Sequence, residues 1–211
     1  MGSRPETVAG RRAGLRGWGP VVVALVMLSM NTTAEAVAQM PGPIPNGRLT
    51  SGMLSFDGHA TLGDFTGTTR TVTGQLTGAP EISSVRGWVE APVESLKTGD
   101  RKRDKDLNKS MESSKYPNLR FDLNSITAKQ SAGDSIPVTL HGTLNIHGVT
   151  RRLELPGPIV FKGQTARVRT DFPLNLKEYG IGGLSKMLGM LKMHENIEVH
   201  VDLVFGLGAG G

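Results

Sequence analysis

The chain has 211 residues, of which 37% are apolar, 28 are Gly and 12 are Pro, and its formal net charge is +5. This length fits one domain that buries a core of its own. Because the sequence contains no Cys, disulfide bonds, thiol catalysis, Cys-ligated zinc and iron–sulfur clusters are excluded. A high glycine content without a fixed repeat favours a turn-rich all-β protein.

Residues 1–38 have the pattern of a secretory signal peptide. Four Arg and one Glu precede an apolar run at 21–28, and two A-x-A sequences follow it, at 34–36 and 36–38. A basic start, a short apolar run and a small-residue cleavage site are typical of such peptides. The run is shorter than the ~20 apolar residues that a membrane span needs. We therefore expect cleavage after Ala38, by the general or the twin-arginine route, and a periplasmic or secreted protein.

The residues that follow Ala38 carry 20 Lys and Arg against 17 Asp and Glu, so their net charge is +3. This mild charge gives no strong electrostatic case for a nucleic-acid partner, and we expect none. We find no later apolar run long enough to be a transmembrane span. The sequence leaves the oligomeric state open.

Residues 39–50 contain three Pro and two Gly, which predicts a flexible lead-in before a domain over 51–206. From Ser55 the chain alternates with a period of two, and Gly63-Asp64 indicates a turn. The Thr-rich residues 66–77 also suit strands.

Clear alternation returns at 119–123, 138–147 and 197–205, as in strands with one buried face. Turn signals separate the strands, at 78–80, 132–134, 147–149 and 156–158. About eight strands fit this length, which predicts an all-β, antiparallel sandwich or up-and-down barrel of one domain. The glycine-rich residues 207–211 are expected to form a flexible tail.

Two segments depart from the β pattern. Residues 100–114 are polar, with Leu107 and Met111 four positions apart, which predicts a short exposed helix with a narrow apolar stripe. Residues 184–193 are rich in Met and Leu, and such adaptable apolar segments recur at binding surfaces. This segment either plugs one end of a barrel or forms a lid over a ligand. The lid candidates are Leu184, Met187, Leu188, Met190 and Leu191.

Six short strings occur in one order along the chain. They are Ser55-Phe-Asp-Gly-His-Ala with Gly63-Asp-Phe65, Ser95-Leu-Lys-Thr98-Gly, Arg103-Asp104-Lys-Asp106-Leu107, Lys115-Tyr-Pro117 with Phe121, Leu144-Asn-Ile-His147-Gly148-Val149-Thr150-Arg151, and the strand Val199 to Phe205. From about Leu54 to Phe205 the chain therefore resembles the YceI-like family of exported, lipocalin-type β-barrel proteins.

This resemblance implies an extended antiparallel barrel whose apolar tunnel holds a polyisoprenoid or a similar amphiphilic lipid. An eight-stranded barrel has room for about one small ligand or a side-chain core. The sequence differs from well-known members after Arg103-Asp104, where they continue with His-Leu and a Phe-Phe stretch. Here Lys105 to Met111 lack that aromatic pair, so the shape of the cavity and the ligand are not carried over.

The inward positions of the alternating strands are the candidate lining of a binding cavity. Alternation reports burial only, so the same pattern fits a packed core. The resemblance favours a tunnel, and so does the small number of aromatic residues, six Phe, two Trp and two Tyr. The candidate lining residues are Phe56, Leu119, Phe121, Leu123, Leu140, Leu144, Ile146, Val199, Val201, Leu203 and Phe205.

Polar candidates are fewer. Arg103 and Asp104, which match a family signature, either hold a polar head group or anchor the start of the helix through capping and an ion pair; we favour the structural role. His141 and His200 fall on polar strand faces and His147 falls at a hairpin, which argues against a metal site.

The sequence contains no G-x-S-x-G, H-E-x-x-H or G-x-x-x-x-G-K motif. Together with the family resemblance, which implies the lipid ligand, this leads us to expect a non-enzymatic, exported and soluble carrier of an amphiphilic lipid, with an isoprenoid or quinone-like chain and no cofactor. Two alternatives remain open: a small envelope hydrolase or isomerase that uses the same cavity, and an envelope interaction protein with a packed barrel.

Overall fold

The structure is a computed structural model, and it describes residues 42–60, 63–130, 134–181 and 193–208. All of these residues belong to one compact unit, residues 36–211. The expected signal peptide and its cleavage site lie outside the described residues. So do the lid candidates Leu184, Met187, Leu188, Met190 and Leu191.

The described residues form nine antiparallel strands, one α-helix and three 3₁₀ turns. The strands are β1 (Gly47–Ala60), β2 (Gly63–Thr69), β3 (Thr73–Thr77), β4 (Arg86–Pro92), β5 (Asn118–Ala128), β6 (Ser135–Ile146), β7 (Val149–Lys162), β8 (Thr165–Asn175) and β9 (Asn196–Leu207). The helix is α1 (Arg101–Ser110), and the 3₁₀ turns are η1 (Ile82–Ser84), η2 (Val93–Ser95) and η3 (Leu176–Tyr179).

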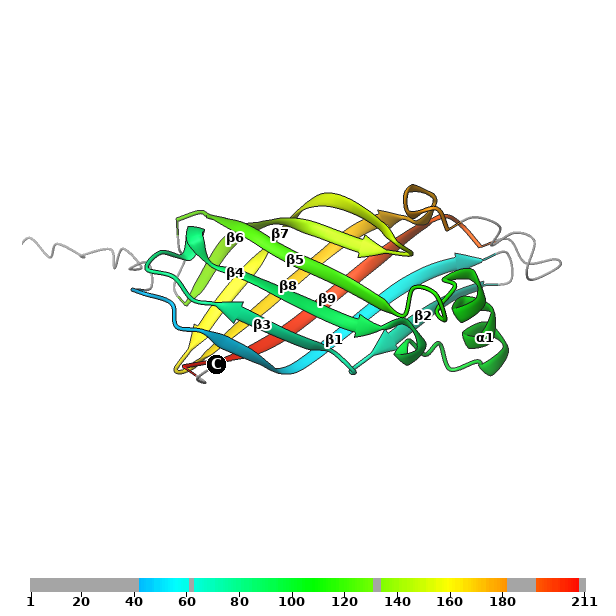
Figure 1. Ribbon diagram of the computed structural model, residues 1–211, viewed down its shortest axis with the longest axis horizontal. Helices are drawn as coiled ribbons and strands as arrows, with labels where there is room; N and C mark the ends of the chain where they lie inside the picture. Colours follow the sequence, from blue (N-terminus) through cyan, green and yellow to red (C-terminus); the bar gives the residue numbers. More distant parts are fainter. Residues whose placement is uncertain (1–41, 61–62, 131–133, 182–192, 209–211) are drawn as a thin grey trace, which may run out of the picture. The chain divides into compact units, whose positions relative to one another are not determined.

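Eight of the strands close into a barrel (Figure 1). From β3 to β9 each strand pairs with the next one in sequence, and β1 pairs with both β3 and β9 to complete the ring. The short strand β2 folds back on the second half of β1. The predicted all-β, antiparallel barrel with a short helix is thus confirmed. None of the helices within the described residues has the length and apolar character needed to cross a membrane.

Strand β8 shows how the alternation of side chains builds the wall of the barrel. Its buried residues, Ala166, Val168, Thr170, Phe172 and Leu174, alternate with residues exposed on the outside. Successive side chains of a strand point to opposite faces of a sheet. Because the outward positions are mostly charged and the inward ones mostly apolar, a shift of one residue in register would bury the charges, and only one register is stable.

The hairpin between β6 and β7 forms where it was expected. His147 and Gly148 both have positive φ, 54° and 75°, and Ile146 pairs with Val149 across the turn. A two-residue turn with two positive φ values matches the twist of antiparallel strands. Gly148 also lies against the ring of Tyr116, so a β-carbon at this position would clash with that ring.

The turn predicted at 156–158 is wrong. Pro156, Gly157 and Pro158 lie inside β7 and pair with β6. The two prolines are tolerated because β7 pairs with β8 only from Ile159 onward, and a proline suits a strand edge on which no N–H group is needed. Gly157 allows the close approach of Arg169 of β8, whose carbonyl oxygen a β-carbon would overlap.

The boundaries of the domain also differ from the expectation. Ile44 is 7% exposed, and its N–H and C=O bond to Ala79 at 2.8 and 2.9 Å. β1 begins at Gly47, so the residues from Ile44 to 50 are not a flexible lead-in. At the other end Leu207 still belongs to β9. These segments are ordered because each pairs with the other or with a neighbouring strand.

Gly63-Asp64 is not the turn that the sequence indicated. Gly63 and Asp64 already belong to β2 and pair with Ala60 and His59 of β1. The Thr-rich stretch 66–77, expected to suit strands, contains most of β2 and all of β3. The break allows β2 and β3 to pair with different halves of the long strand β1.

Candidate binding cavity

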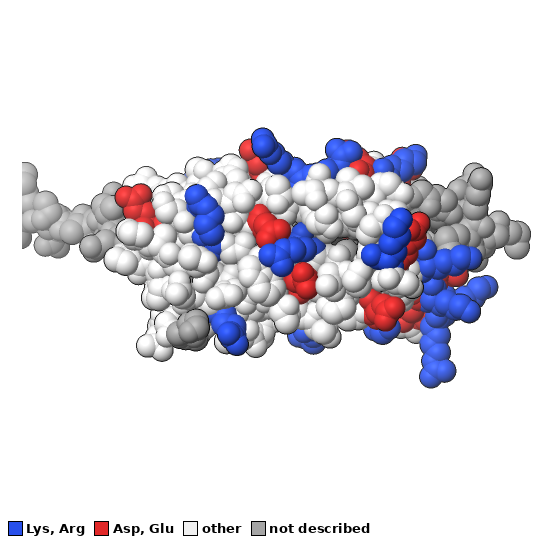
Figure 2. All heavy atoms as spheres, in the orientation of Figure 1, with Lys and Arg blue, Asp and Glu red and all other residues white. Residues whose placement is uncertain are grey.

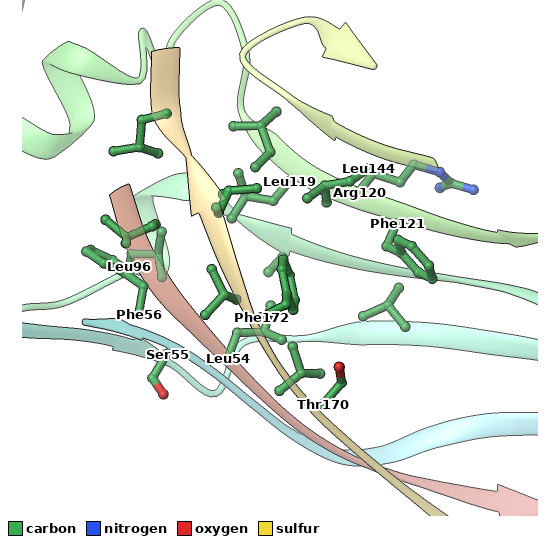
Figure 3. Close-up of a pocket in the computed structure, with 18 of the residues that line it drawn as sticks. Leu54, Ser55, Phe56, Leu96, Leu119, Arg120, Phe121, Leu144, Thr170 and Phe172 are labelled. Carbon is green, nitrogen blue, oxygen red and sulfur yellow. The ribbon is translucent and has the colours of Figure 1, made fainter. Parts of the chain in front are cut away.

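The interior of the barrel contains an apolar cavity of about 170 Å³. Of the 27 described residues that line it, 23 are apolar, and the others are Ser55, Ser110, Arg120 and Thr170. Figure 3 shows Phe56, Leu119 and Phe172 around the common space, whereas the guanidinium group of Arg120 points away from it. That group binds Asp122 and Glu90 instead. The cavity surface is therefore almost entirely hydrocarbon.

A second cavity of about 70 Å³ lies further along the barrel. Residues from five strands line both cavities, so the two spaces adjoin. These shared residues are Val89, Phe121, Leu140, Val168 and Leu203. The interior thus contains two adjoining apolar cavities, and Phe121 and its neighbours form the wall that they share.

All eleven residues proposed as lining from the sequence lie on the walls of these cavities. Six line the larger cavity, namely Phe56, Leu119, Leu144, Ile146, Val199 and Val201. Phe121, Leu140 and Leu203 line both. Leu123 and Phe205 line the smaller one. Their contact with a ligand stays a prediction.

Several lining residues were missed. Val168, Phe172 and Leu174 come from β8, where alternation over 165–175 was already a usable signal. Leu176 is the first residue of η3, and Ile181 lies two residues after the end of η3. No sequence pattern marks these two, because chain folding at the end of the barrel brings them to the cavity.

Helix α1 covers one end of the tunnel. Leu107, Ser110 and Met111 line the larger cavity, so the predicted apolar stripe of Leu107 and Met111 packs inward. The helix begins after Asp100, whose carboxylate accepts hydrogen bonds from the N–H groups of Lys102 and Arg103 at 2.8 and 3.0 Å. These bonds, the one from Arg103 most of all, lower the pKa of Asp100, as expected for an N-cap carboxylate.

Arg103 and Asp104 do not cap the helix themselves, which corrects the sequence interpretation. Asp104 accepts hydrogen bonds from the N–H and the hydroxyl group of Thr98, at 2.8 and 2.7 Å. Arg103 lies over the ring of Phe65, with 4.3 Å between the guanidinium carbon and the ring centre. Both residues thus tie α1 to the strands and the loop below it. A cation–π contact of this kind contributes about 0.5–1 kcal/mol at an exposed site.

The backbone ladder between β7 and β8 stops before this end. β7 and β8 pair only between Ile159–Lys162 and Thr165–Val168, although both strands continue toward α1. The turn η3 follows β8 and supplies Tyr179, which is 1% exposed. Arg151 of β7 donates a hydrogen bond to the carbonyl oxygen of Glu178 at 2.7 Å and lies 3.6 Å from its carboxylate. Arg151 thus joins the unpaired part of β7 to η3.

The three histidines whose sequence positions argued against a metal site lie at separate places on the barrel. His200 is on the outer face, 2.6 Å from Asp171 and 3.1 Å from Asp57. The hydrogen bond to Asp171, with a further one to Asp57, raises the pKa of His200. His141 contacts Thr127 and Glu154. His147 packs on Tyr116 at the hairpin, with 4.7 Å between the ring centres.

Comparisons with known proteins agree with this architecture. The crystal structure of BcnA from Burkholderia cenocepacia matches with a TM-score of 0.61 and 17% identity, over 72% of this chain and 95% of that one. A polyisoprenoid binding domain from Saccharophagus degradans, implicated in plant cell wall breakdown, matches with a TM-score of 0.66 and 15% identity, over 78% and 99% of the two chains. At these identities the likeness shows the fold.

No curated protein sequence matches the chain at a significant level. The sequence model of the YceI-like domain matches residues 50–205, which span the barrel from β1 to β9 and most of the chain. The chain belongs to the YceI-like family.

Proposed function

We propose that the protein binds an amphiphilic lipid with an isoprenoid or quinone-like hydrocarbon chain, and that it carries this lipid outside the cytoplasm. The observation that supports the proposal most strongly is the pair of adjoining apolar cavities inside a closed barrel. A dry apolar cavity of about 150 Å³ is already large enough to take up small apolar molecules. The name of the similar Saccharophagus degradans domain mentions polyisoprenoid binding, which also supports this proposal.

Burial of the hydrocarbon chain provides the affinity. Each methylene group removed from water contributes about 0.8 kcal/mol, so the affinity rises with chain length until the tunnel is full. Apolar burial has no directional preference, and the lining therefore discriminates by length and width. The polar head group remains near α1, at the end where the cavity is covered by Leu107 and Met111.

The proposed location rests on the sequence of residues 1–38, which has the pattern of an export signal. A carrier of this kind releases its ligand unchanged. We favour binding over hydrolysis or isomerisation because the larger cavity presents hydrocarbon, and the hydroxyl group of Thr170 on its wall already donates a hydrogen bond to the carbonyl oxygen of Pro156. The cavities also argue against the alternative of a fully packed barrel.

A chain-length series tests the proposal. Delipidated protein is mixed with detergent-solubilised polyprenols of 15, 20 and more carbons, and the bound fraction is measured after gel filtration. We expect saturable uptake of one molecule per barrel, with an affinity that increases with each added five-carbon unit that is buried, by up to about 4 kcal/mol or roughly 1,000-fold relative to that unit in water. Uptake that is independent of length, or no uptake of any polyprenol or quinone, would contradict the proposal.

A further inference from the structure

The outer surface of α1 is strongly basic. Arg101, Lys102, Lys105 and Lys109 are exposed, and at 3.6 residues per turn they fall within an arc of about 100° on the helix. None of the four forms an ion pair with an acidic side chain among the residues that the structure describes. Elsewhere on the barrel several cations are paired, for example Lys177 with Glu195 at 2.6 Å.

The net charge of the protein is concentrated here. Residues 97–115 contain seven Lys and Arg against four Asp and Glu, an excess of three that equals the excess of the whole chain after Ala38. Of the acids in and before the helix, Asp100 caps it and Asp104 binds Thr98. Asp106 lies beside the basic arc, and no ion pair between it and the four cations is found among the described residues. Figure 2 shows Lys and Arg side chains gathered at the end of the barrel where α1 lies.

The opposite side of the same helix lines the lipid cavity. Leu107, Ser110 and Met111 contribute to the wall of the larger cavity. The angular positions of Leu107 and Met111 lie roughly 150° from the centre of the four cations. One helix therefore presents hydrocarbon to the proposed ligand and an unneutralised row of cations to the surroundings.

We propose that the basic face of α1, formed by Arg101, Lys102, Lys105 and Lys109, docks on a bilayer surface that contains anionic phospholipids. Docking places the covered end of the cavity against the head groups, where an isoprenoid-type lipid enters or leaves. This inference rests on the proposed function for its purpose, but the docking itself requires no ligand. Cations near an anionic membrane each contribute about 1 kcal/mol, which corresponds to about fivefold in the partition coefficient.

Vesicle sedimentation of the full chain tests this docking. We compare vesicles of phosphatidylcholine alone with vesicles that contain one third phosphatidylglycerol, at 0.1 M salt. The test variant is Lys105→Gln/Lys109→Gln, which keeps good helix formers on the exposed face. The control variant is Lys129→Gln/Lys162→Gln, which removes the same charge from exposed positions at the ends of β5 and β7 remote from α1. Residues 1–41 are the same in the wild-type protein and in both variants, so their contribution to vesicle binding cancels when the three are compared.

We expect wild-type protein to bind the anionic vesicles more tightly than the neutral ones, and to lose this difference at 0.5 M salt, because salt screens such charges. The α1 variant should lose about 25-fold in partition coefficient, whereas the control variant should change less than twofold. Equal loss in both variants, or no binding of wild-type protein, would overturn the proposal. Binding to soluble polyglutamate but not to vesicles would assign the face to an acidic protein and would also overturn it.

Uptake of polyprenol from detergent separates this inference from the proposed function. We expect the Lys105→Gln/Lys109→Gln variant to take up polyprenol as wild type does, since its cavity is unchanged. If wild-type protein takes up polyprenol but ignores anionic vesicles, only the docking proposal fails. If it sediments with anionic vesicles but takes up no polyprenol, the lipid-carrier proposal fails.

Discussion

Replacing Val201 with Phe distinguishes a cavity from a packed core. Val201 lies on β9 and lines the larger cavity. Replacing it with Phe adds about 50 Å³ of side-chain volume. At ~24 cal/mol per Å³ of filled cavity, this volume stabilises the ligand-free barrel by about 1 kcal/mol. The same volume corresponds to about two methylene groups of ligand, or about 1.6 kcal/mol of binding. We therefore expect a midpoint of thermal unfolding that rises by about 2–4 °C and a Kd for polyprenol that weakens by about tenfold.

Val138 provides the matched control. It is 3% exposed, it also faces inward from a strand, β6, and it lines neither cavity. The identical change, Val138→Phe, overpacks this position and should destabilise the protein by about 1–3 kcal/mol. Urea unfolding of both variants without ligand measures the two effects. If Val201→Phe is as destabilising as Val138→Phe, the interior is packed and the reasoning is refuted.

Three further predictions concern the lining, the outer face and the contact between Arg151 and η3. Leu144→Asp should destabilise the protein by about 3 kcal/mol or more in urea unfolding at pH 7, because it buries a carboxylate, whereas Thr143→Asp on the outer face should cost less than about 1 kcal/mol. His200 has a raised pKa in the folded state through its bond to Asp171, so its stabilisation is complete below the unfolded pKa of about 6.5 and is lost as pH rises through the folded pKa. His200→Gln should therefore cost up to about 1 kcal/mol at pH 5.5 and less at pH 8.5. Arg151→Gln should speed exchange of bound polyprenol by about 2–10-fold in stopped-flow displacement, because it releases η3 from β7.

Each of these predictions has an outcome that contradicts it. Equal stability of the two Asp variants would mean that the faces of β6 are assigned wrongly. If His200→Gln lowers the free energy of unfolding by the same amount at pH 5.5 and at pH 8.5, the protonated ring is not the stabilising form. Unchanged exchange in Arg151→Gln, together with unchanged stability, would show that η3 does not control access to the cavity.

Residues on regular strands were largely predictable from the sequence, whereas residues brought together by the ends of the barrel were not. Alternation located Leu144 and Val201 because a strand with one buried face repeats every two residues. The same rule could have identified Phe172 of β8. The turn signal at Pro156 was wrong, because a strand edge that needs no N–H group on one side tolerates proline. Ile181 reaches the cavity through η3, and no local pattern encodes that path.

Whether the interior is filled could not be derived from the alternation at all. The sequence of β9 would read the same for a packed core as for a tunnel wall, since both bury Val199 and Leu203 on one face. The difference depends on how strands far apart in the sequence are spaced around the ring. In the same way, the pattern of residues 100–114 predicted a helix, but only the fold shows that Met111 covers the cavity while Lys109 faces outward.

Native mass spectrometry of the protein purified without detergent from its own cells tests the central claim most directly. Solvent extraction of the same sample then identifies any bound species. We expect a barrel that carries one lipid of discrete mass with an isoprenoid-type chain, and a Val201→Phe variant that carries it at lower occupancy. A protein that emerges empty, and that stays empty after incubation with quinones and polyprenyl lipids, would contradict the account.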